Sequence, residues 1–295
     1  MLPYINVYQG KEVFSIILNI KENVAIFEKH IRENYDMEVD KIYNKFYHTL
    51  RVMKHCIGLA KKKGLAKEKI YLASLIGLLH DIGTFLQITE NGTYVAIGIT
   101  DHGDLGVNIL FEQGLIREFL KTTEYDEIIK AAVKNHNKAA IDPDLDEESR
   151  LFAQILRDAD KLDIFYIITD YNPDHLPQQA VEKGYAPKGP ISPKIWDALI
   201  NHRTMTYADA QSYDDEYLIH TAGYIVDVNF SETFEYIREL KYIDKIFKHS
   251  QSNNPKMDEA YRIISDFINE KIGNLETSSS FKIVEVTDGK SVKTV

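Results

Sequence analysis

The stretch IYLASLIGLLHDIG, residues 70–83, decides how this chain folds. Nearly all of residues 70–79 are apolar, so the helix they predict is buried on most of its surface. The run is too short to cross a bilayer, which takes about 20 residues. It leads directly into His80-Asp81. Because a buried carboxylate is costly without a partner, we expect a metal ion, or a lysine or arginine, beside Asp81.

Four further segments each place one ligand-type residue near an inner face or an end. His48 lies on the helix predicted for residues 40–63, and His102 opens the helix predicted for residues 102–113. His136 ends the helix predicted for residues 124–135, and Asp160 lies within the largely apolar helix predicted for residues 147–169. Imidazole and carboxylate groups suit divalent metals. The joint set therefore predicts a metal site.

Each of these residues also has a structural interpretation when it is taken alone. A lone histidine is more often a capping or core group than a ligand, and a His-Asp pair occurs by chance in many chains. Asp160 could pair with Arg157, three residues earlier. The whole set in this order is much harder to explain by chance.

The rest of the sequence predicts a mainly α protein with short β pieces at its ends. Apolar clusters within residues 1–24 predict an N-terminal hairpin, and the Asp288-Gly289 turn predicts a hairpin or tail in residues 276–295. Between them we expect a helical core at residues 25–170. Residues 171–275 are expected to form a loop or lid, rich in Pro and Gly, followed by C-terminal helices packed on the core.

Composition indicates a globular protein of the cytoplasm. The formal net charge is -10, which disfavours broad attraction to nucleic acid or to an anionic membrane. Cys56 is the single cysteine, which fits a reducing compartment, and the first ten residues lack the pattern of a signal peptide. We expect no nucleic-acid partner and no membrane segment. Nothing in the sequence decides whether the chain forms an oligomer.

The order of three motifs resembles the HD superfamily of metal-dependent phosphohydrolases. They are His48-Thr49-Leu50-Arg51, Leu79-His80-Asp81-Ile82-Gly83 and Arg157-Asp158-Ala159-Asp160-Lys161-Leu162-Asp163. The resemblance covers roughly residues 25 to 170 and implies an HD-domain helical bundle. It also implies that His48, His80, Asp81 and Asp160, rather than Asp158 or Asp163, are metal ligands.

Some HD families add two histidines between the HD pair and the last aspartate, and these bind a second metal. His102 and His136 resemble those two residues. We therefore prefer a binuclear site over a mononuclear one. The resemblance does not distinguish among Mn, Fe, Mg, Ni, Co and Zn.

The chain departs from the HD subfamily that cleaves cyclic dinucleotides. That subfamily usually has lysine where this chain has Thr84, and two adjacent histidines where it has Asn135-His136. Its Gly-Tyr-Pro signature should follow those histidines closely. The nearest string, Gly184-Tyr185-Ala186-Pro187, comes only after Asp160. We therefore do not assign that activity.

The resemblance implies a hydrolase in which Asp81 bridges two metal ions. His48, His80 and Asp160 would complete one site, and His102 and His136 the other. The expected substrate is a small phosphate ester, of which a nucleotide is the first candidate. Arg51 and Lys161 are the predicted phosphate-binding residues, with a solvated or ion-paired base as the alternative for each.

Several questions stay open at this point. Asp101 and Asp104 flank His102 and could orient it or cap its helix. The six-residue pattern also resembles HD-fold di-iron oxygenases such as inositol oxygenase. A third hypothesis is a non-catalytic HD scaffold with a regulatory role.

Overall fold

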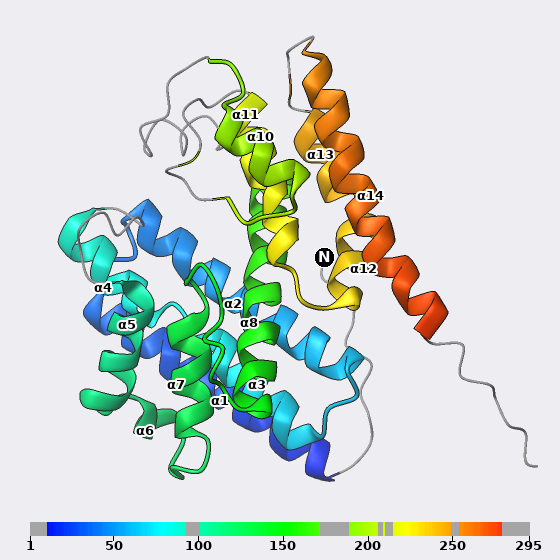
Figure 1. Ribbon diagram of the computed structural model, residues 1–295. Coiled ribbons are helices and arrows are strands. Elements are labelled where there is room, and N and C mark those ends of the chain that lie inside the picture. Colours follow the sequence, from blue (N-terminus) through cyan, green and yellow to red (C-terminus); the bar gives the residue numbers. More distant parts are fainter. Residues whose placement is uncertain are drawn as a thin grey trace, which may run out of the picture.

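Every regular element that the described residues contain is a helix, which confirms the mainly α prediction (Figure 1). The computed structural model describes residues 11–92, 101–171, 189–205, 209, 215–248, 250 and 254–278, with side chains between residues 19 and 273. The first elements are α1 (Lys11–Asn34), α2 (Asp40–Lys62), α3 (Lys67–Leu79), α4 (Ile82–Asn91), α5 (His102–Val107), η1 (Asn108–Glu112), α6 (Ile116–Phe119), α7 (Asp126–Asn135), α8 (Glu147–Tyr166) and η2 (Ile167–Tyr171). The later ones are α10 (Pro193–Ile200), α11 (Asp215–Ala222), η3 (Gly223–Asp227), α12 (Ser231–Glu239), α13 (Tyr242–Lys248) and α14 (Pro255–Ser278).

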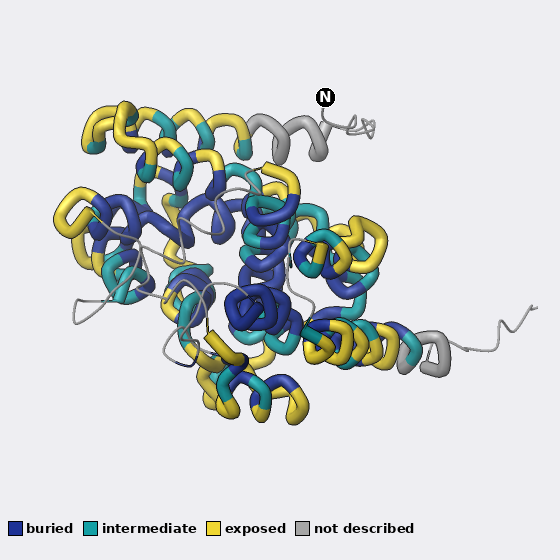
Figure 2. The backbone as a smooth tube through the Cα atoms, turned by 90° about the horizontal axis from the view of Figure 1, so that it is seen from above, coloured by how far each residue is buried: buried dark blue, intermediate teal, exposed yellow. Residues whose placement is uncertain are grey.

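The helix that carries the apolar run lies in the core, as its composition predicts. All residues of α3 from Leu72 to Leu79 are buried, and α2, α1 and α8 pack against it. Figure 2 shows that buried residues gather in the middle of the molecule, whereas the outer faces of the peripheral helices are exposed. The stretch Lys67–Asn91 is long and apolar enough to cross a membrane, but 89% of its most apolar window is buried inside the protein. Burial of this kind is also found in the core helix of a soluble protein.

The chain bends at the His80-Asp81 pair instead of continuing as one helix. The apolar run predicts a helix that leads directly into this pair. The structure ends α3 at Leu79, and Asp81 leaves helical geometry with φ -104° and ψ 16°. A second helix, α4, follows and ends at Gly92, whose φ is 67°. Gly92 therefore caps a helix C-terminus, a common place for glycine in this conformation.

The predicted N-terminal hairpin is wrong over the part that the structure describes. Residues 11–24 belong to α1, which packs against α3. Phe27 and Ile31 are fully buried on the inner face of α1. Residues 1–10, the predicted C-terminal hairpin and residues 172–188 of the predicted lid lie outside the described residues. Pro193, in the same Pro- and Gly-rich part of the sequence, is the first residue of α10.

The C-terminal helices lie above α8 and to its right in Figure 1, and α12 contacts α8. Asp158, which is fully buried on α8, accepts hydrogen bonds from the backbone N–H groups of Asn229 and Phe230, both at 2.9 Å. Its carboxylate also accepts from the Thr233 hydroxyl at 2.7 Å. One carboxylate thereby satisfies the start of α12 and attaches it to the helix that carries Asp160.

Candidate metal centre

The structure brings all six predicted metal ligands together. They come from five places in the core: α2, the α3–α4 junction, the start of α5, the end of α7 and α8. One donor atom from each member lies within 4.8 Å of the others in two overlapping groups, His48–His80–Asp160 and His80–Asp81–His136. His102 joins through its Nε2 atom, which lies 3.2 Å from Nε2 of His136.

The two carboxylate oxygens of Asp81 face different halves of this cluster. Its Oδ2 lies 3.3 Å from Nε2 of His48 and 3.1 Å from Nε2 of His80. Its Oδ1 lies 3.7 Å from Nε2 of His102 and 3.6 Å from Nε2 of His136. Asp81 therefore stands between two sets of histidine nitrogens, with one oxygen toward each.

Backbone carbonyls orient two of the histidines. Nδ1 of His80 lies 2.8 Å from the carbonyl oxygen of Gly77, and Nδ1 of His136 lies 2.6 Å from that of Val133. A carbonyl only accepts hydrogen bonds, so Nδ1 carries the proton in both rings. In a neutral ring Nε2 is then left with a lone pair, and that atom faces the cluster.

His48 is oriented by a side chain, Asp163, that the sequence argument set aside as a ligand. Asp163 is fully buried, and its Oδ2 lies 2.6 Å from Nδ1 of His48. Arg51 donates to the same carboxylate, from Nε at 2.6 Å and from Nη2 at 3.1 Å. A carboxylate behind a ligand histidine fixes the ring and raises its basicity. The available signal was the spacing of three residues from Asp160, which places both aspartates on one side of α8.

The free nitrogens meet a test that a metal site should pass. Nε2 of His48 and Nε2 of His80 are buried and have no hydrogen-bond partner among the residues that the structure describes, although carboxylate oxygens lie near both. A buried polar atom without a partner is costly and calls for an explanation. Two such nitrogens facing acidic oxygens are a donor set of the kind that divalent transition metals bind.

The electrostatics of the cluster favour a positive charge at its centre. Burial alone would lower the pKa of His48, but Asp160, Asp163 and Asp81 outweigh burial and the nearby Lys45 and raise it to about 10. Burial would likewise raise the pKa of Asp81, but Lys45 and the surrounding histidines hold it well below its usual range. The cluster therefore stabilises a cation in the position of the His48 proton.

The second half of the cluster has a different electrostatic character. Burial, together with the neighbouring His136, lowers the pKa of His102 to about 4. His102 is therefore neutral at pH 7, with a lone pair on one ring nitrogen. A neutral imidazole is the form that binds a metal.

Lys45 and Thr84 contact Asp81, and the sequence argument named neither as a site residue. Nζ of Lys45 lies 2.6 Å from Oδ2 of Asp81, and Thr84 donates its hydroxyl to Oδ1 at 2.6 Å. The general expectation of a lysine or arginine beside this carboxylate is thus met. The signal for Lys45 was its place three residues before His48, one turn away on α2.

The other predicted residues lie as follows. Lys161 is buried and its ammonium contacts Asp227. Arg157 does not pair with Asp160; it also contacts Asp227, at 2.6 Å, and donates to the carbonyl of Asn135 at 2.7 Å. The phosphate-binding role of Lys161 stays a prediction, and its ammonium would have to leave Asp227 first.

Asp101 caps the helix that begins with His102. Its Oδ1 accepts from the backbone N–H groups of Gly103 at 2.9 Å and of Asp104 at 3.2 Å, which confirms the capping interpretation. Asp101 and Asp104 both pair with Lys138, at 2.8 and 2.9 Å. These contacts attach the start of α5 to the chain just beyond α7.

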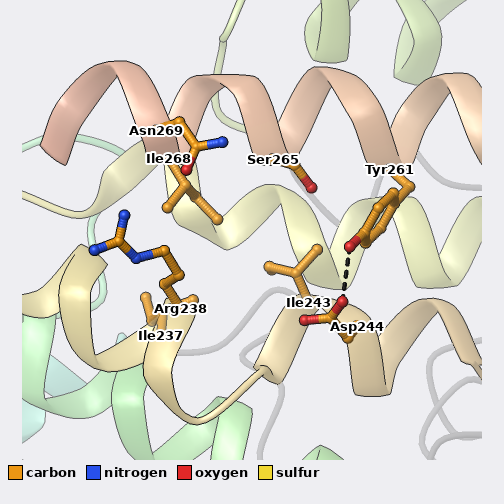
Figure 3. A pocket seen from close by; sticks show the side chains of 8 residues that line it. All are labelled: Ile237, Arg238, Ile243, Asp244, Tyr261, Ser265, Ile268 and Asn269. Atoms are coloured by element: carbon orange, nitrogen blue, oxygen red, sulfur yellow. Dashed lines mark hydrogen bonds between the residues drawn. The ribbon is translucent and has the colours of Figure 1, made fainter. Parts of the chain in front are cut away.

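A separate pocket lies among α12, α13 and α14, away from the cluster (Figure 3). Its volume is about 200 Å³, and the Tyr261 hydroxyl at its edge donates to Asp244 at 2.7 Å. It is lined by Ile237, Arg238, Ile243, Asp244, Tyr261, Ser265, Ile268 and Asn269. None of the six clustered residues belongs to this lining.

Comparison with known proteins identifies the helical core. Residues 46–164 match the family model of the HD domain. Neither curated proteins nor solved structures give a match.

Proposed function

We propose that the cluster binds two divalent metal ions and that the protein uses them to hydrolyse a small phosphate ester. Residues 46–164 match the HD domain, the domain of a superfamily of metal-dependent hydrolases. One ion would be held by His48, His80, Asp81 and Asp160, and the other by Asp81, His102 and His136. The observation that carries this proposal is the division of Asp81, with Oδ2 toward one pair of histidines and Oδ1 toward the other.

Bound metal ions would polarise a phosphoryl oxygen and lower the pKa of water toward neutrality. The protein's part is to hold the ligands in place. Asp163, Gly77 and Val133 orient three of the rings. Because these partners take Nδ1, each ring directs Nε2 toward the cluster.

Positive side chains beside the cluster suit a phosphorylated substrate. Arg51 uses Nε and Nη2 on Asp163, whereas its Nη1 has no hydrogen bond to any residue that the structure describes. Its side chain is 22% exposed, so Nη1 can reach an incoming phosphate. The Lys45 side chain is 17% exposed and already lies at the cluster's edge. We propose Arg51 and Lys45 as phosphate-binding groups, and a nucleotide as the first candidate substrate.

The test is metal analysis combined with a phosphatase screen over nucleotides and simple phosphate esters. We expect His80→Ala and Asp81→Ala to lose bound metal and to reduce hydrolysis at least about a hundredfold, because each removes a ligand. His30→Ala, on α1 and outside the cluster, is the matched control and should keep both. Full metal content and full activity in the two ligand variants would disprove the proposal.

The same samples separate the two rival functions. Iron in the purified protein, with oxygen consumption and no phosphate release, would identify an oxygenase. Protein purified without chelator that contains no metal would favour a regulatory scaffold.

A further inference from the structure

Exposed aromatic side chains gather beside the metal cluster. Within the described residues, the exposed large hydrophobic side chains are Val39, Tyr43, Tyr47, Tyr171, Ile200 and Leu240. Half of these are tyrosines: Tyr43 and Tyr47 lie on α2, the helix that carries Arg51, and Tyr171 lies on η2. Their exposed fractions are 43% for Tyr43, 38% for Tyr47 and 47% for Tyr171. Together with the half-buried Tyr166 they are called the tyrosine cluster below.

The rings of the tyrosine cluster form two pairs, and the pair of Tyr166 and Tyr171 lies against Arg51. The centroids of Tyr43 and Tyr47 are 4.7 Å apart, and those of Tyr166 and Tyr171 are 6.2 Å apart. The Arg51 guanidinium lies 5.4 Å from the Tyr166 centroid and 5.3 Å from the Tyr171 centroid. These are stacking and cation–π distances.

Two short contacts link the tyrosine cluster to the metal ligands. Arg51 lies against the rings and donates to Asp163, and Asp163 in turn holds His48. Tyr47 is the residue directly before His48. Tyr166 follows Asp160 by six positions on α8, roughly 9 Å along the helix axis. A ring attached to a phosphate at the metal cluster could therefore reach these tyrosines.

We infer that the tyrosine cluster is a stacking subsite for an aromatic base, so that the substrate is a nucleotide rather than a phosphorylated sugar. This inference rests on the proposed function, because the metal cluster is what would hold the phosphate. Stacking on tyrosine suits a base because every base offers a π-face. Arg51 would then contact the tyrosine rings on one side and the phosphate on the other.

The test compares two probes that share a phosphate and a ribose. Binding of adenosine 5′-monophosphate and of ribose 5-phosphate to the metal-loaded protein is measured by calorimetry. We expect the nucleotide to bind at least about tenfold more tightly. Tyr47→Leu and Tyr171→Leu should each reduce that preference about fivefold or more, the lower range for loss of one stacking ring. Tyr47→Phe and Tyr171→Phe keep the ring and should restore it.

Tyr236→Leu, on α12, is the control and should leave the preference unchanged. Equal binding of the two probes, no binding of either, or equal weakening of both in the leucine variants would overturn the subsite. Phosphate release is measured on the same samples. A ring preference without hydrolysis would contradict the proposed function and keep the subsite, whereas hydrolysis without a ring preference would do the reverse.

Discussion

At the scale of single residues, His48 is the point where the chemistry of the cluster is decided. One nitrogen of its ring is taken by Asp163, and the other is buried between Asp81 and Asp160. Burial opposes charging this ring, yet the three carboxylates prevail and raise its pKa to about 10. A proton and a metal ion therefore compete for the same nitrogen.

This competition predicts that metal binding releases protons and strengthens as the pH rises. Below a pKa of about 10 the His48 ring is protonated, so at pH 7 the metal must displace that proton. The metal affinity should rise with pH, up to about tenfold per pH unit for each proton released. Calorimetric titration in two buffers of different ionisation enthalpy counts the protons.

The matched variant is His48→Gln, which removes this titrating group. It should bind metal more weakly and release about one proton fewer. A metal affinity that stays constant from about pH 6 to about pH 8 would contradict the prediction.

At the scale of elements, the close approach of α4 and α5 positions His102. A Cβ atom on Gly83 would lie 2.2 Å from the carbonyl oxygen of His102 and 2.6 Å from the backbone nitrogen of Gly106. No side chain fits there, because both neighbours are backbone atoms. Gly83 is thus required for the helix contact that brings His102 to the HD pair.

We therefore expect Gly83→Ala to destabilise the protein and to weaken the second half of the metal centre. The extra methyl group must push α5 away, at a cost of about 3 kcal/mol in the free energy of unfolding. Denaturant unfolding and metal content measure the two effects.

Gly58, on α2, is the control for this substitution. No atom of the described part of the chain lies within 4 Å of a Cβ atom built there. Gly58→Ala should stabilise the protein by up to about 1 kcal/mol, because alanine favours helix. An equal effect of the two substitutions would show that the α4–α5 contact is not tight.

At the scale of the whole molecule, α8 joins the metal centre to the C-terminal helices. Asp160 and Asp163 on α8 serve the cluster, whereas Asp158 holds the start of α12 and Arg157 contacts Asp227. One helix therefore carries residues for both functions. Separation of the C-terminal helices from α8 would expose a buried carboxylate and its donors.

Asp158→Ala should therefore lower the free energy of unfolding by about 3 kcal/mol, because the buried donors of Phe230 and Thr233 lose their acceptor. Thr233→Val removes only one of these hydrogen bonds and should cost about 1 kcal/mol. Denaturant titration of both variants makes the comparison. A loss in Asp158→Ala no larger than that in Thr233→Val would argue against this role of α8.

The sequence alone determined the buried helix α3 and the six residues that meet beside it. Both follow from local properties: an apolar run indicates burial, and residue type with order along the chain predicts a ligand set. The HD-domain match over residues 46–164 bears out the family that these motifs indicated. The N-terminal hairpin failed because a short apolar run does not distinguish a strand from a helix, and packing of α1 against α3 decided it.

Only the tertiary structure decided how the ligands are held and how the cluster is divided. His48 and Asp163 touch across 115 positions of sequence, and Lys45 reaches Asp81 across 36. Such pairs depend on how α2, α4 and α8 cross, which no local pattern encodes. The same holds for the histidines that face the two oxygens of Asp81 and for the tyrosine cluster. In both, side chains from elements far apart in the chain lie close together.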